Sequence, residues 1–486
     1  EFRKVIRCHN PRHVPGVGIR EVGEMGMKVT VGSEIRIQHP TSELVAWVRE
    51  ELVMPNPEYS KKLRMGLWVG RTPAQITLYR VDGDSLYLPC GAGKGIRPFL
   101  SGDTLISQDL ADNGALDYQG TIPLYGYQEA AVKAMEAAGC GILKSPCGSG
   151  KTQMGIALAA SIGRKALWVT HTQDLLNQSY SRAAQYLPES CLGKIAAGKV
   201  QVGSHITFAT VQTLSKLDLG RYRYTWDVVV VDECHRLAGS PAAVTMFYKV
   251  MSSLAARYKY GLSATVHRSD GLIKSTFAVI GEVAYTVPEE AVAEKTMQVQ
   301  VCKVPTGIGP NRCILDTDGT LEYSKLLPYL TGSMERNQVI VGKLRENKGH
   351  FNLVLSDRLE HLRTLKSLLD AGGDAVMIDG KMSSKKGKAV RGQALEDIRA
   401  GRKHYLFASY SLAKEGLDIP CLDRLYLTTP KKDYAVVTQS IGRIARKAEG
   451  KQDAVCYDFV DNIGFCENQY RKRKTSYRKA GCRIHE

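Results

Sequence analysis

Residues 140–152 read Cys-Gly-Ile-Leu-Lys-Ser-Pro-Cys-Gly-Ser-Gly-Lys-Thr, an apolar β-type run that enters a glycine-rich turn and then a helical stretch. Gly148 and Gly150 would let backbone N–H groups approach a phosphate, and the N-terminus of the following helix adds a favourable dipole. Lys151 is expected to reach the β- and γ-phosphates, and the Thr152 hydroxyl to bind Mg²⁺. The stretch therefore predicts a nucleotide-binding loop; a glycine-rich strand–helix turn without nucleotide is the alternative.

A second motif, which contains two adjacent acidic residues, lies about eighty residues further along the chain. Four valines, 228–231, run directly into Asp232-Glu-Cys-His235. A buried parallel strand that ends in two carboxylates places them at the carboxyl edge of the sheet, beside a phosphate loop. Asp232 is expected to hold Mg²⁺, and Glu233 to orient and polarise the water that attacks the γ-phosphate. A strand end followed by a capped helix is the alternative interpretation.

The hydrophobic pattern around these motifs predicts the fold class. From about residue 121, continuous apolar runs alternate with helical stretches, and a second such set begins near residue 335. Apolar strands between amphipathic helices are typical of parallel sheets covered on both faces. The expected strands lie at Cys140–Lys144, Lys165–Thr170, His205–Ala209, Trp226–Val231, Phe351–Ser356, Ala375–Ile378, His404–Ala408 and Arg424–Thr428. We expect two successive α/β domains of about 150 residues each.

Composition and charge narrow the class of protein. The chain has 486 residues and 66 Lys and Arg against 49 Asp and Glu, a formal net charge of +17. A hydrophobic fraction of 43% excludes global disorder, and no apolar run reaches the 18–20 residues that span a bilayer. The first ten residues lack the apolar core of a secretory signal, so we expect a cytoplasmic protein; the resemblance described below implies a prokaryotic or phage-infected cell. The twelve cysteines form no CxxC pair, which favours reduced thiols over disulfides or structural zinc.

The sequence from about 121 to 465 resembles the superfamily 2 helicases and translocases. Leu124–Gln128 is similar to their adenine-recognition motif, and Ser263-Ala-Thr265 to the motif that couples hydrolysis to strand binding. The segments 170–178 and 209–214 resemble motifs that hold nucleic-acid phosphates. Residues 267–271, His-Arg-Ser-Asp-Gly, resemble the corresponding motif in the branch that includes XPB, RadD and phage UvsW, although Val266 stands where that branch commonly has Pro.

The second domain continues this resemblance. Residues 353–358 are similar to motif four, and Ser409–Pro420 to motif five. Residues 439–446, Gln-Ser-Ile-Gly-Arg-Ile-Ala-Arg, match the arginine-finger motif, whose cations would stabilise charge on the transferred phosphoryl group. Arg443 and Arg446 lie three residues apart, on one face if the segment is helical. A surface helix that carries two arginines is the alternative.

The resemblance implies a set of site residues and cofactors. ATP and Mg²⁺ are the expected cofactors, with Thr152 and Asp232 on the metal. The expected catalytic residues are Lys151, Asp232, Glu233, Arg443 and Arg446. The expected nucleotide contacts are Gln128, Gly148, Ser149, Gly150, Lys151, Thr152, Gly416, Asp418 and Gln439. Ser263 and Thr265 are the coupling residues. The expected nucleic-acid contacts are Thr172, Gln178, Thr210, Gln212 and Arg358.

The resemblance also implies an architecture of two tandem RecA-like lobes with a small N-terminal α+β accessory domain. We expect the accessory domain at 1–115, lobes at 121–287 and 335–465, a connector or insertion at 288–334, and a basic tail at 466–486. A helix is expected at Ser42–Leu52, and Gly91–Gly95 marks a loop. The accessory domain looks similar to that of UvsW-type helicases. Its Lys61, Lys62, Arg64 and Arg71, around Trp68, are candidates for DNA contact; an ordinary charged packing face is the alternative.

The basic tail has two interpretations. Residues 470–483, with Tyr470 and Tyr477 among the charges, could contact phosphates and stack on bases, or could be a disordered solubilising end. For the whole chain we expect an ATP-dependent DNA helicase or translocase acting on forked or recombination-type DNA, with protein partners of recombination, repair or defence and no membrane. A duplex translocase of a restriction or phage-defence complex is the alternative, and a non-catalytic nucleic-acid scaffold is a third hypothesis.

Overall fold

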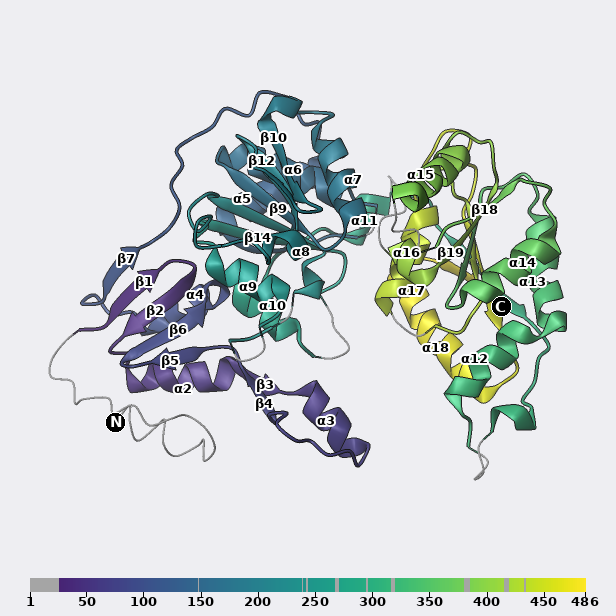
Figure 1. The fold of residues 1–486 in the computed structure, drawn as a ribbon, viewed down its shortest axis with the longest axis horizontal. Helices are drawn as coiled ribbons and strands as arrows, with labels where there is room; N and C mark the ends of the chain where they lie inside the picture. Colours follow the sequence, from purple (N-terminus) through teal and green to yellow (C-terminus); the bar gives the residue numbers. More distant parts are fainter. Residues whose placement is uncertain are drawn as a thin grey trace. The chain divides into compact units, whose positions relative to one another are not determined.

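The structure, a computed structural model, describes residues 26–486 apart from 147, 238, 242–243, 267–270, 294–295, 316–319, 380–384, 415–418 and 432–433. The chain divides into two compact units. The first comprises Glu1–Ser145 and Gly150–Val287, and the second comprises Pro146–Ser149 and Pro288–Glu486. Each unit is built around its own sheet, as Figure 1 shows.

The largest sheet of the first unit has eight strands in the order β11-β10-β12-β9-β13-β14-β8-β15. Every neighbouring pair is parallel except β10 with β11. The strands are β8 (Cys140–Lys144), β9 (Ala166–Thr170), β10 (Leu192–Ala196), β11 (Lys199–Gln201), β12 (Ile206–Thr210), β13 (Val228–Asp232), β14 (Tyr258–Ser263) and β15 (Val283–Thr286). The central strands β9, β12 and β13 are buried along their whole length, which explains their uninterrupted apolar sequences.

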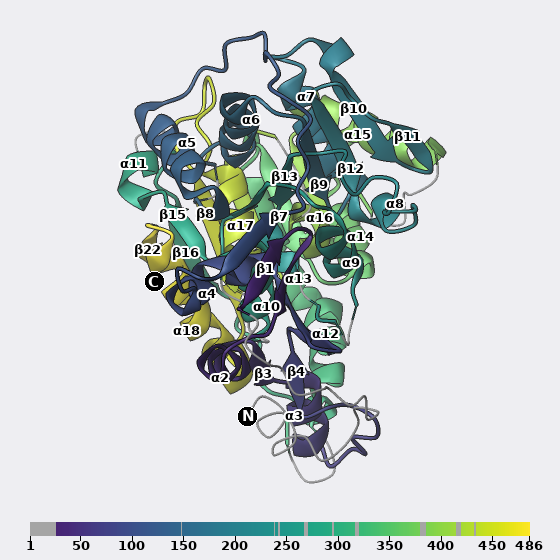
Figure 2. The same cartoon turned by 90° about the vertical axis from the view of Figure 1, so that its left-hand side faces the viewer.

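Helices cover this sheet, and Figure 2 shows α5, α6 and α7 beside its strands. The helical elements are α5 (Gly126–Ala138), α6 (Lys151–Ile162), α7 (Gln173–Ala183), η3 (Glu189–Cys191), α8 (Val211–Leu214), η4 (Cys234–Arg236), α9 (Met246–Ser253) and α10 (Ile273–Ile280). Trp226, Val229 and Val231 pack with Phe247 and Met251 of α9 in one buried apolar cluster. The α/β class expected for this part of the chain is confirmed.

A second, five-stranded sheet lies in the N-terminal part of the same unit, in the order β5-β6-β2-β1-β7. Only β1 and β7 pair in parallel. Its elements and those beside it are β1 (Lys28–Val31), β2 (Glu34–Gln38), α2 (Ser42–Glu51), β3 (Val53–Pro55), α3 (Pro57–Arg64), β4 (Gln75–Thr77), β5 (Arg80–Asp82), β6 (Ser85–Pro89), η1 (Cys90–Ala92), α4 (Gly93–Ile96), η2 (Arg97–Phe99) and β7 (Leu105–Gln108). The helix expected at Ser42–Leu52 is confirmed as α2, which the Thr41 side chain caps.

The loop expected at Gly91–Gly95 is wrong, because η1 and α4 form consecutive helical turns there. The glycines serve close packing instead. A Cβ atom on Gly91 would overlap the carbonyl oxygen of Phe277 in α10, and one on Gly95 would overlap the Trp47 ring. Ala278 of α10 also belongs to the apolar core of the N-terminal sheet, so the accessory region packs directly on α10.

The second unit contains a seven-stranded, fully parallel sheet in the order β18-β19-β17-β20-β21-β16-β22. Its strands are β16 (Gln300–Pro305), β17 (Asn352–Ser356), β18 (Ala375–Met377), β19 (Tyr405–Ser409), β20 (Arg424–Leu427), β21 (Val455–Val460) and β22 (Arg483–His485). Its helical elements are α11 (Glu289–Ala293), η5 (Arg312–Ile314), α12 (Tyr323–Gly332), α13 (Met334–Glu346), α14 (Leu359–Leu369), α15 (Lys385–Arg399), α16 (Tyr410–Lys414), α17 (Tyr434–Ile444) and α18 (Gly464–Lys479).

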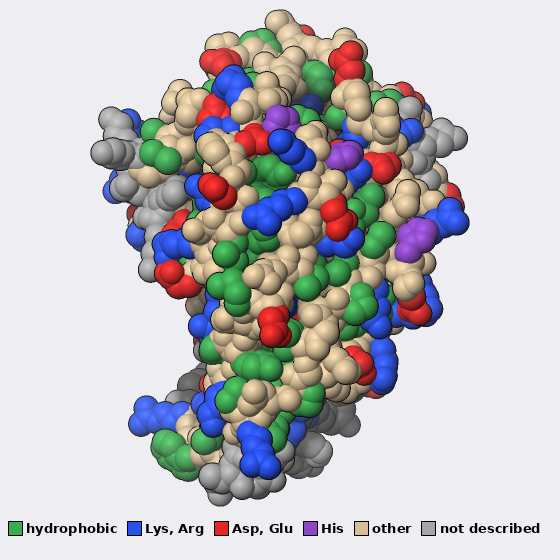
Figure 3. All heavy atoms as spheres, turned by 90° about the vertical axis from the view of Figure 1, so that its right-hand side faces the viewer, with side chains coloured by type: hydrophobic (Ala, Val, Ile, Leu, Met, Phe, Trp, Pro, Cys, Tyr) green, Lys and Arg blue, Asp and Glu red, His purple; other side chains and the backbone are tan. Residues whose placement is uncertain are grey.

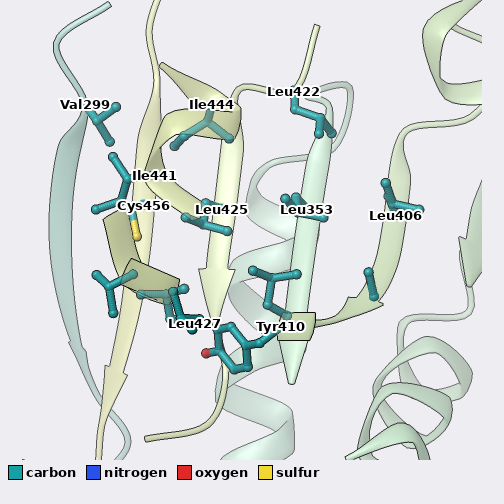
Figure 4. Close-up of a cluster of buried hydrophobic side chains, with 14 of the residues drawn as sticks. Val299, Leu353, Leu406, Tyr410, Leu422, Leu425, Leu427, Ile441, Ile444 and Cys456 are labelled. Carbon is teal, nitrogen blue, oxygen red and sulfur yellow. The ribbon is translucent and has the colours of Figure 1, made fainter. Parts of the chain in front are cut away.

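The core of this unit joins strands and helices that are distant in the sequence. Figure 4 shows Leu353, Leu406 and Leu425 from three strands beside Ile441 and Ile444 of α17. Strand β16 lies between β21 and β22, so the segment 288–334, expected to be an irregular connector or insertion, contributes a strand to the second sheet.

The segment expected to be a basic tail is also part of this unit. Residues 464–479 form α18, in which Tyr470, Arg473 and Tyr477 are buried, and β22 then joins the sheet edge beside β16. The interpretation as a disordered end is therefore wrong. On the face that Figure 3 shows, lysine and arginine side chains are interspersed with acidic ones and do not gather into one patch. Within the described residues, no helix has the length and apolar character to cross a membrane.

Candidate nucleotide and nucleic-acid site

The glycine-rich turn connects β8 to α6, two elements of the first unit, and its residues Pro146–Ser149 group with the second unit. Gly148 and Gly150 have φ angles of +84° and +82°, a conformation that glycine adopts without steric cost. Gly150 caps α6, whose first residue is Lys151 and whose second is Thr152. The Lys151 Nζ donates a hydrogen bond to the carbonyl oxygen of Ser145 at 3.3 Å, so the lysine folds back over the turn. Ser149 Oγ donates to the Pro146 carbonyl at 2.7 Å.

Gln128 lies beside this turn. It is buried in the first turn of α5, and its Oε1 accepts a hydrogen bond from the Tyr125 backbone N–H at 2.9 Å. A Cβ atom at Gly150 would overlap Gln128 Nε2, so only glycine fits between the helix and the amide. The structure thus brings the residue expected to recognise adenine next to the expected phosphate loop.

The two adjacent carboxylates end strand β13. Asp232 is buried, and one of its oxygens accepts the Glu233 backbone N–H at 3.0 Å. Glu233 has a φ of +51°, a left-handed conformation that is uncommon for a residue with a side chain and is often kept at functional sites. Burial, and then the charge of Glu233, raise the pKa of Asp232 to about 7, while the charge of Lys151 opposes this shift.

The raised pKa of Asp232 is relevant to the metal ion that the sequence predicts at this position. A buried carboxylate beside a second carboxylate is an oxygen donor whose charge a hard divalent cation would compensate. Among the described residues, no group of three or more His, Cys, Asp or Glu side chains could hold a metal by itself. The buried Asp232 carboxylate thus fits a hard divalent cation such as Mg²⁺, and the part of the Thr152 hydroxyl in holding it stays a prediction.

A close polar contact followed by hydrogen bonds links the acidic strand end to the expected coupling motif. His235 Nδ1 lies 3.2 Å from Glu233 Oε2 and 3.0 Å from Ser263 Oγ. Ser263 Oγ donates its hydrogen to the Thr265 carbonyl at 2.6 Å, so toward His235 it can only accept. We infer from this that His235 Nδ1 carries a proton. The Ser145 N–H in turn donates to the Ser263 carbonyl at 3.0 Å, which connects this chain to the phosphate loop.

His235 belongs to the acidic motif, but the sequence alone predicts no role for it. Its contact with Ser263 spans 28 positions, and only the parallel pairing of β13 with β14 brings the two strand ends together. The one available signal was that both motifs directly follow an apolar strand. Neighbouring parallel strands end at the same edge of a sheet, so their motifs could be expected to meet.

Three of the expected nucleic-acid contacts gather at the carboxyl ends of β9 and β12. The Thr172 hydroxyl caps α7 by accepting the Leu175 N–H at 3.3 Å. Gln212 Nε2 donates to the His171 carbonyl at 2.6 Å, and Thr210 Oγ1 donates to Thr213 Oγ1 at 3.0 Å. These side chains lie together at one sheet edge, and their contact with nucleic-acid phosphates stays a prediction.

The remaining expected contacts are more dispersed. Gln178 lies further along α7 and is half-buried. Arg358 belongs to the second unit, where it is exposed at the start of α14. Gln439 and Arg443 lie on α17 of that unit, and Arg446 follows the helix and pairs through its backbone with Thr296. Gly416 and Asp418 fall outside the described residues, as do residues 267–270 of the branch motif.

Two family models match the chain. Residues 121–268 match the family described as type III restriction enzyme, res subunit, and residues 335–448 match the helicase conserved C-terminal domain. Together the models cover more than half of the sequence, and each falls on one of the two parallel sheets.

Named relatives point the same way. A protein of Acanthamoeba polyphaga mimivirus that carries the name of an ATP-dependent RNA helicase is 27% identical over 82% of this chain and 76% of its own length. The DNA 3'-5' helicase XPB of Mycobacterium tuberculosis is 24% identical over 69% of this chain and 60% of its own length. An HsdR subunit fragment of a Vibrio vulnificus type I restriction enzyme has the same fold over 70% of this chain and 64% of its own, with 15% identity and a TM-score of 0.52.

Proposed function

Because this chain belongs to the superfamily 2 helicases, in the branch that includes XPB, we propose that it couples ATP hydrolysis to the unwinding or branch migration of forked or recombination-type DNA. It is an ATP-hydrolysing helicase that acts on nucleic acid. The choice of DNA over RNA, and of branched DNA over simple duplexes, is the part that we propose. Protein partners from a recombination, repair or defence complex, and a cytoplasmic location, are further proposals.

The observation that carries the proposal is the continuous path from the phosphate loop to the coupling motif. Lys151, Asp232 and Glu233 interact electrostatically, and His235 and Ser263 connect Glu233 to the backbone of Ser145. A change of charge at the γ-phosphate would therefore act on a hydrogen-bonded element that also ends strand β14. Such a path is what a motor needs in order to convert hydrolysis into movement of bound nucleic acid.

We assign a role to each residue of this path. Lys151 binds the β- and γ-phosphates, and Glu233 orients the attacking water and accepts its proton. Asp232 and Thr152 would hold Mg²⁺, which neutralises charge on the phosphates when bound. Arg443 and Arg446 of the second unit are proposed as the cations that stabilise the transferred phosphoryl group. Thr172, Thr210 and Gln212 are proposed to hold phosphates of the nucleic acid.

A second candidate function is supported by the family model over residues 121–268 and by the fold of the HsdR fragment. Both come from restriction enzymes, so a motor that moves along a duplex without separating its strands is the alternative. A nuclease would then have to lie outside these 486 residues. Preference for DNA rests on the XPB relative, and the relative named as an RNA helicase makes RNA a necessary arm of any test.

The test is to measure ATP hydrolysis with single strands, duplexes, forks, four-way junctions and RNA hybrids, and to run strand displacement beside triplex displacement. We expect strong stimulation by forks and junctions and displacement of a paired strand. Removal of the triplex strand without unwinding would establish the duplex translocase instead. Glu233→Gln should abolish both activities while ATP still binds, and an unchanged hydrolysis rate in that variant would remove our assignment of the base.

A further inference from the structure

A small excursion from the N-terminal sheet carries a helix that contributes nothing to the core. Strand β3 pairs antiparallel with β4, and the chain between them forms α3 and a tight loop. None of the side chains of α3 is buried, although the helix has eight residues. Figures 1 and 2 both place α3 beyond the β3–β4 ribbon, away from the five-stranded sheet. A helix outside the core needs another reason for its sequence.

The tip of this excursion, residues 57–72, has a defined conformation. Asn56 caps the start of α3 and its amide donates to the Pro73 carbonyl at 2.9 Å. At the other end, the Gly66 N–H bonds to the Leu63 carbonyl and the Leu67 N–H to the Lys62 carbonyl at 2.9 Å. This is the hydrogen-bond pattern of a Schellman cap, with Gly66 in the left-handed conformation. The tip is therefore a held structure that presents fixed side chains.

Those side chains are apolar and exposed to an unusual degree. Leu63, Met65 and Leu67 are 63%, 60% and 53% exposed, and Trp68 is 87% exposed. The hydrophobic contact that often accompanies a Schellman cap is missing, since its partner position is Lys62. The six-membered ring of Trp68 lies over Gly70, where an added Cβ atom would come within 2.9 Å of it. One side of the indole thus rests on the backbone, and the rest of the ring faces solvent.

The charges around the tryptophan are almost all positive. Lys61, Arg64 and Arg71 are exposed, and none of them forms an ion pair among those found in the described residues. Lys62 is different because its Nζ is bound by Glu58 at 2.8 Å and by Thr72 Oγ1 at 2.7 Å. Lys62 therefore ties the helix to the returning loop, and it leaves the set of DNA contacts expected from the sequence.

An aromatic platform among exposed cations fits a polyanion that carries flat rings. Base–aromatic stacking is tolerant of sequence, and lysine and arginine beside it neutralise phosphates. We propose that Trp68 stacks on the base pair at the branch point of forked DNA, while Lys61, Arg64 and Arg71 contact the flanking phosphates. This inference rests on the proposed function, and it assigns to the accessory region the recognition of the fork itself.

The test uses the full chain and a fork with 2-aminopurine in the last base pair before the branch, without nucleotide. Stacking of Trp68 should change the 2-aminopurine fluorescence with the wild type and with Trp68→Phe, and should not with Trp68→Ala. In strand displacement we expect Trp68→Ala to unwind forks about tenfold more slowly, in line with the cost of losing one aromatic–base stack. Leu105→Ala is the matched control, because Leu105 is 62% exposed on β7 of the same region.

Failure of this inference can be told apart from failure of the proposed function. If the wild type shows no stimulated hydrolysis and no unwinding, the motor assignment fails. If the wild type unwinds forks and Trp68→Ala does so equally, with the same 2-aminopurine signal, only the stacking proposal is overturned. Loss of binding to anionic vesicles in Trp68→Ala, with unchanged fork binding, would assign the tip to a membrane and would also overturn the proposal. Because Leu105 has no place in the proposed contact, stimulation of ATP hydrolysis by DNA should stay unchanged in Leu105→Ala.

Discussion

Strand β21 of the second sheet and strand β13 of the first both lead into buried carboxylates, yet their surroundings differ. Asp458 accepts two hydrogen bonds of 2.8 Å from the buried Arg473, and Asp461 accepts two, of 2.7 and 3.3 Å, from the buried Arg336. Asp232 instead lies beside Glu233, and burial with that second negative charge outweighs the effect of Lys151 on its pKa. Burial of charge alone therefore does not mark a site.

The difference separates structural from chemical use of the same residue type. Each aspartate near β21 has an arginine that satisfies it, so these pairs fasten α18 and α13 to the second sheet. The carboxylates at the end of β13 are both negative when ionised, and their repulsion is unfavourable until a cation binds. The comparison predicts that mutation of the first kind costs stability, and mutation of the second kind costs activity.

The largest effect is expected from breaking the pair in the second sheet. Arg473→Met leaves Asp458 buried without its partner, which costs about 3–5 kcal/mol of the free energy of unfolding. Chemical denaturation followed by circular dichroism measures this loss. Arg471→Ala, on an exposed position of the same helix, is the control and should change little. A loss below about 1 kcal/mol for Arg473→Met would contradict the structural role of the pair.

The next variant should show the opposite behaviour to Arg473→Met, a loss of activity without a loss of stability. Asp232→Asn should lower ATP hydrolysis by about 10²–10³-fold, the usual cost of a lost electrostatic contact at a reacting group. Its stability should not fall. Because the pKa of Asp232 is raised from 3.8 to about 7, folding favours the protonated acid, and the free energy of unfolding declines as pH rises through that interval.

The pH dependence supplies the measurement. Denaturation of the nucleotide-free protein at pH 4, 5.5 and 7 should show a steeper decline of stability for the wild type than for Asp232→Asn, because the amide does not ionise. An identical decline in both proteins would show that Asp232 ionises normally and would contradict the electrostatic imbalance. Hydrolysis is measured in parallel at saturating DNA and ATP.

A smaller effect is expected where the two motifs of the first sheet meet. Ser263→Ala removes the hydroxyl that accepts from His235 and donates to the Thr265 carbonyl. The loss of one net hydrogen bond corresponds to about two- to tenfold in the coupled step. We expect unwinding to slow by this factor while hydrolysis stays near the wild-type rate. Ser161→Ala, a surface serine of the same unit, is the control; equal losses of both activities would argue against a coupling role.

Sequence reasoning located most of the first sheet because its strands are buried on both faces and its loops carry glycine or acidic signals. The order of the strands, and with it the contact of His235 with Ser263, could not be read from the sequence. The contact depends on which strand lies next to β13, and the hydrophobic pattern does not encode that neighbour. The accessory region was read as strands and turns, but the packing of Gly91 on α10 needed the structure.

The C-terminal helix was misread for a physical reason. Tyr470, Arg473 and Tyr477 have the i, i+3, i+7 spacing of a buried helical stripe. Arg473 lies in the middle of that stripe, and because a buried arginine is rare, the sequence pattern predicts a charge cluster and not a core-facing helix. Its partner Asp458 lies 15 positions earlier, on β21, so nothing local to residues 470–483 revealed that the charge is neutralised.

Because α18 is part of the core, a nucleic-acid role for it must be tested through its exposed side chains alone. This test has the smallest expected effect. Deletion of residues 470–486 would remove Arg473 and Tyr477 from the core, so a loss of DNA binding would report unfolding. Neutralising only the exposed Arg471, Lys472 and Arg478 to Gln avoids this because the buried stripe stays intact. If these side chains neutralise phosphates, each substitution should reduce the magnitude of the slope of log K against log salt concentration by about 0.9, where K is the DNA-binding constant. When the salt concentration doubles, each such contact then accounts for a change of slightly less than about twofold in affinity. Binding titrations at several salt concentrations measure the slope. An unaltered slope would show that these three side chains do not contact DNA, and α18 would then have a structural role alone.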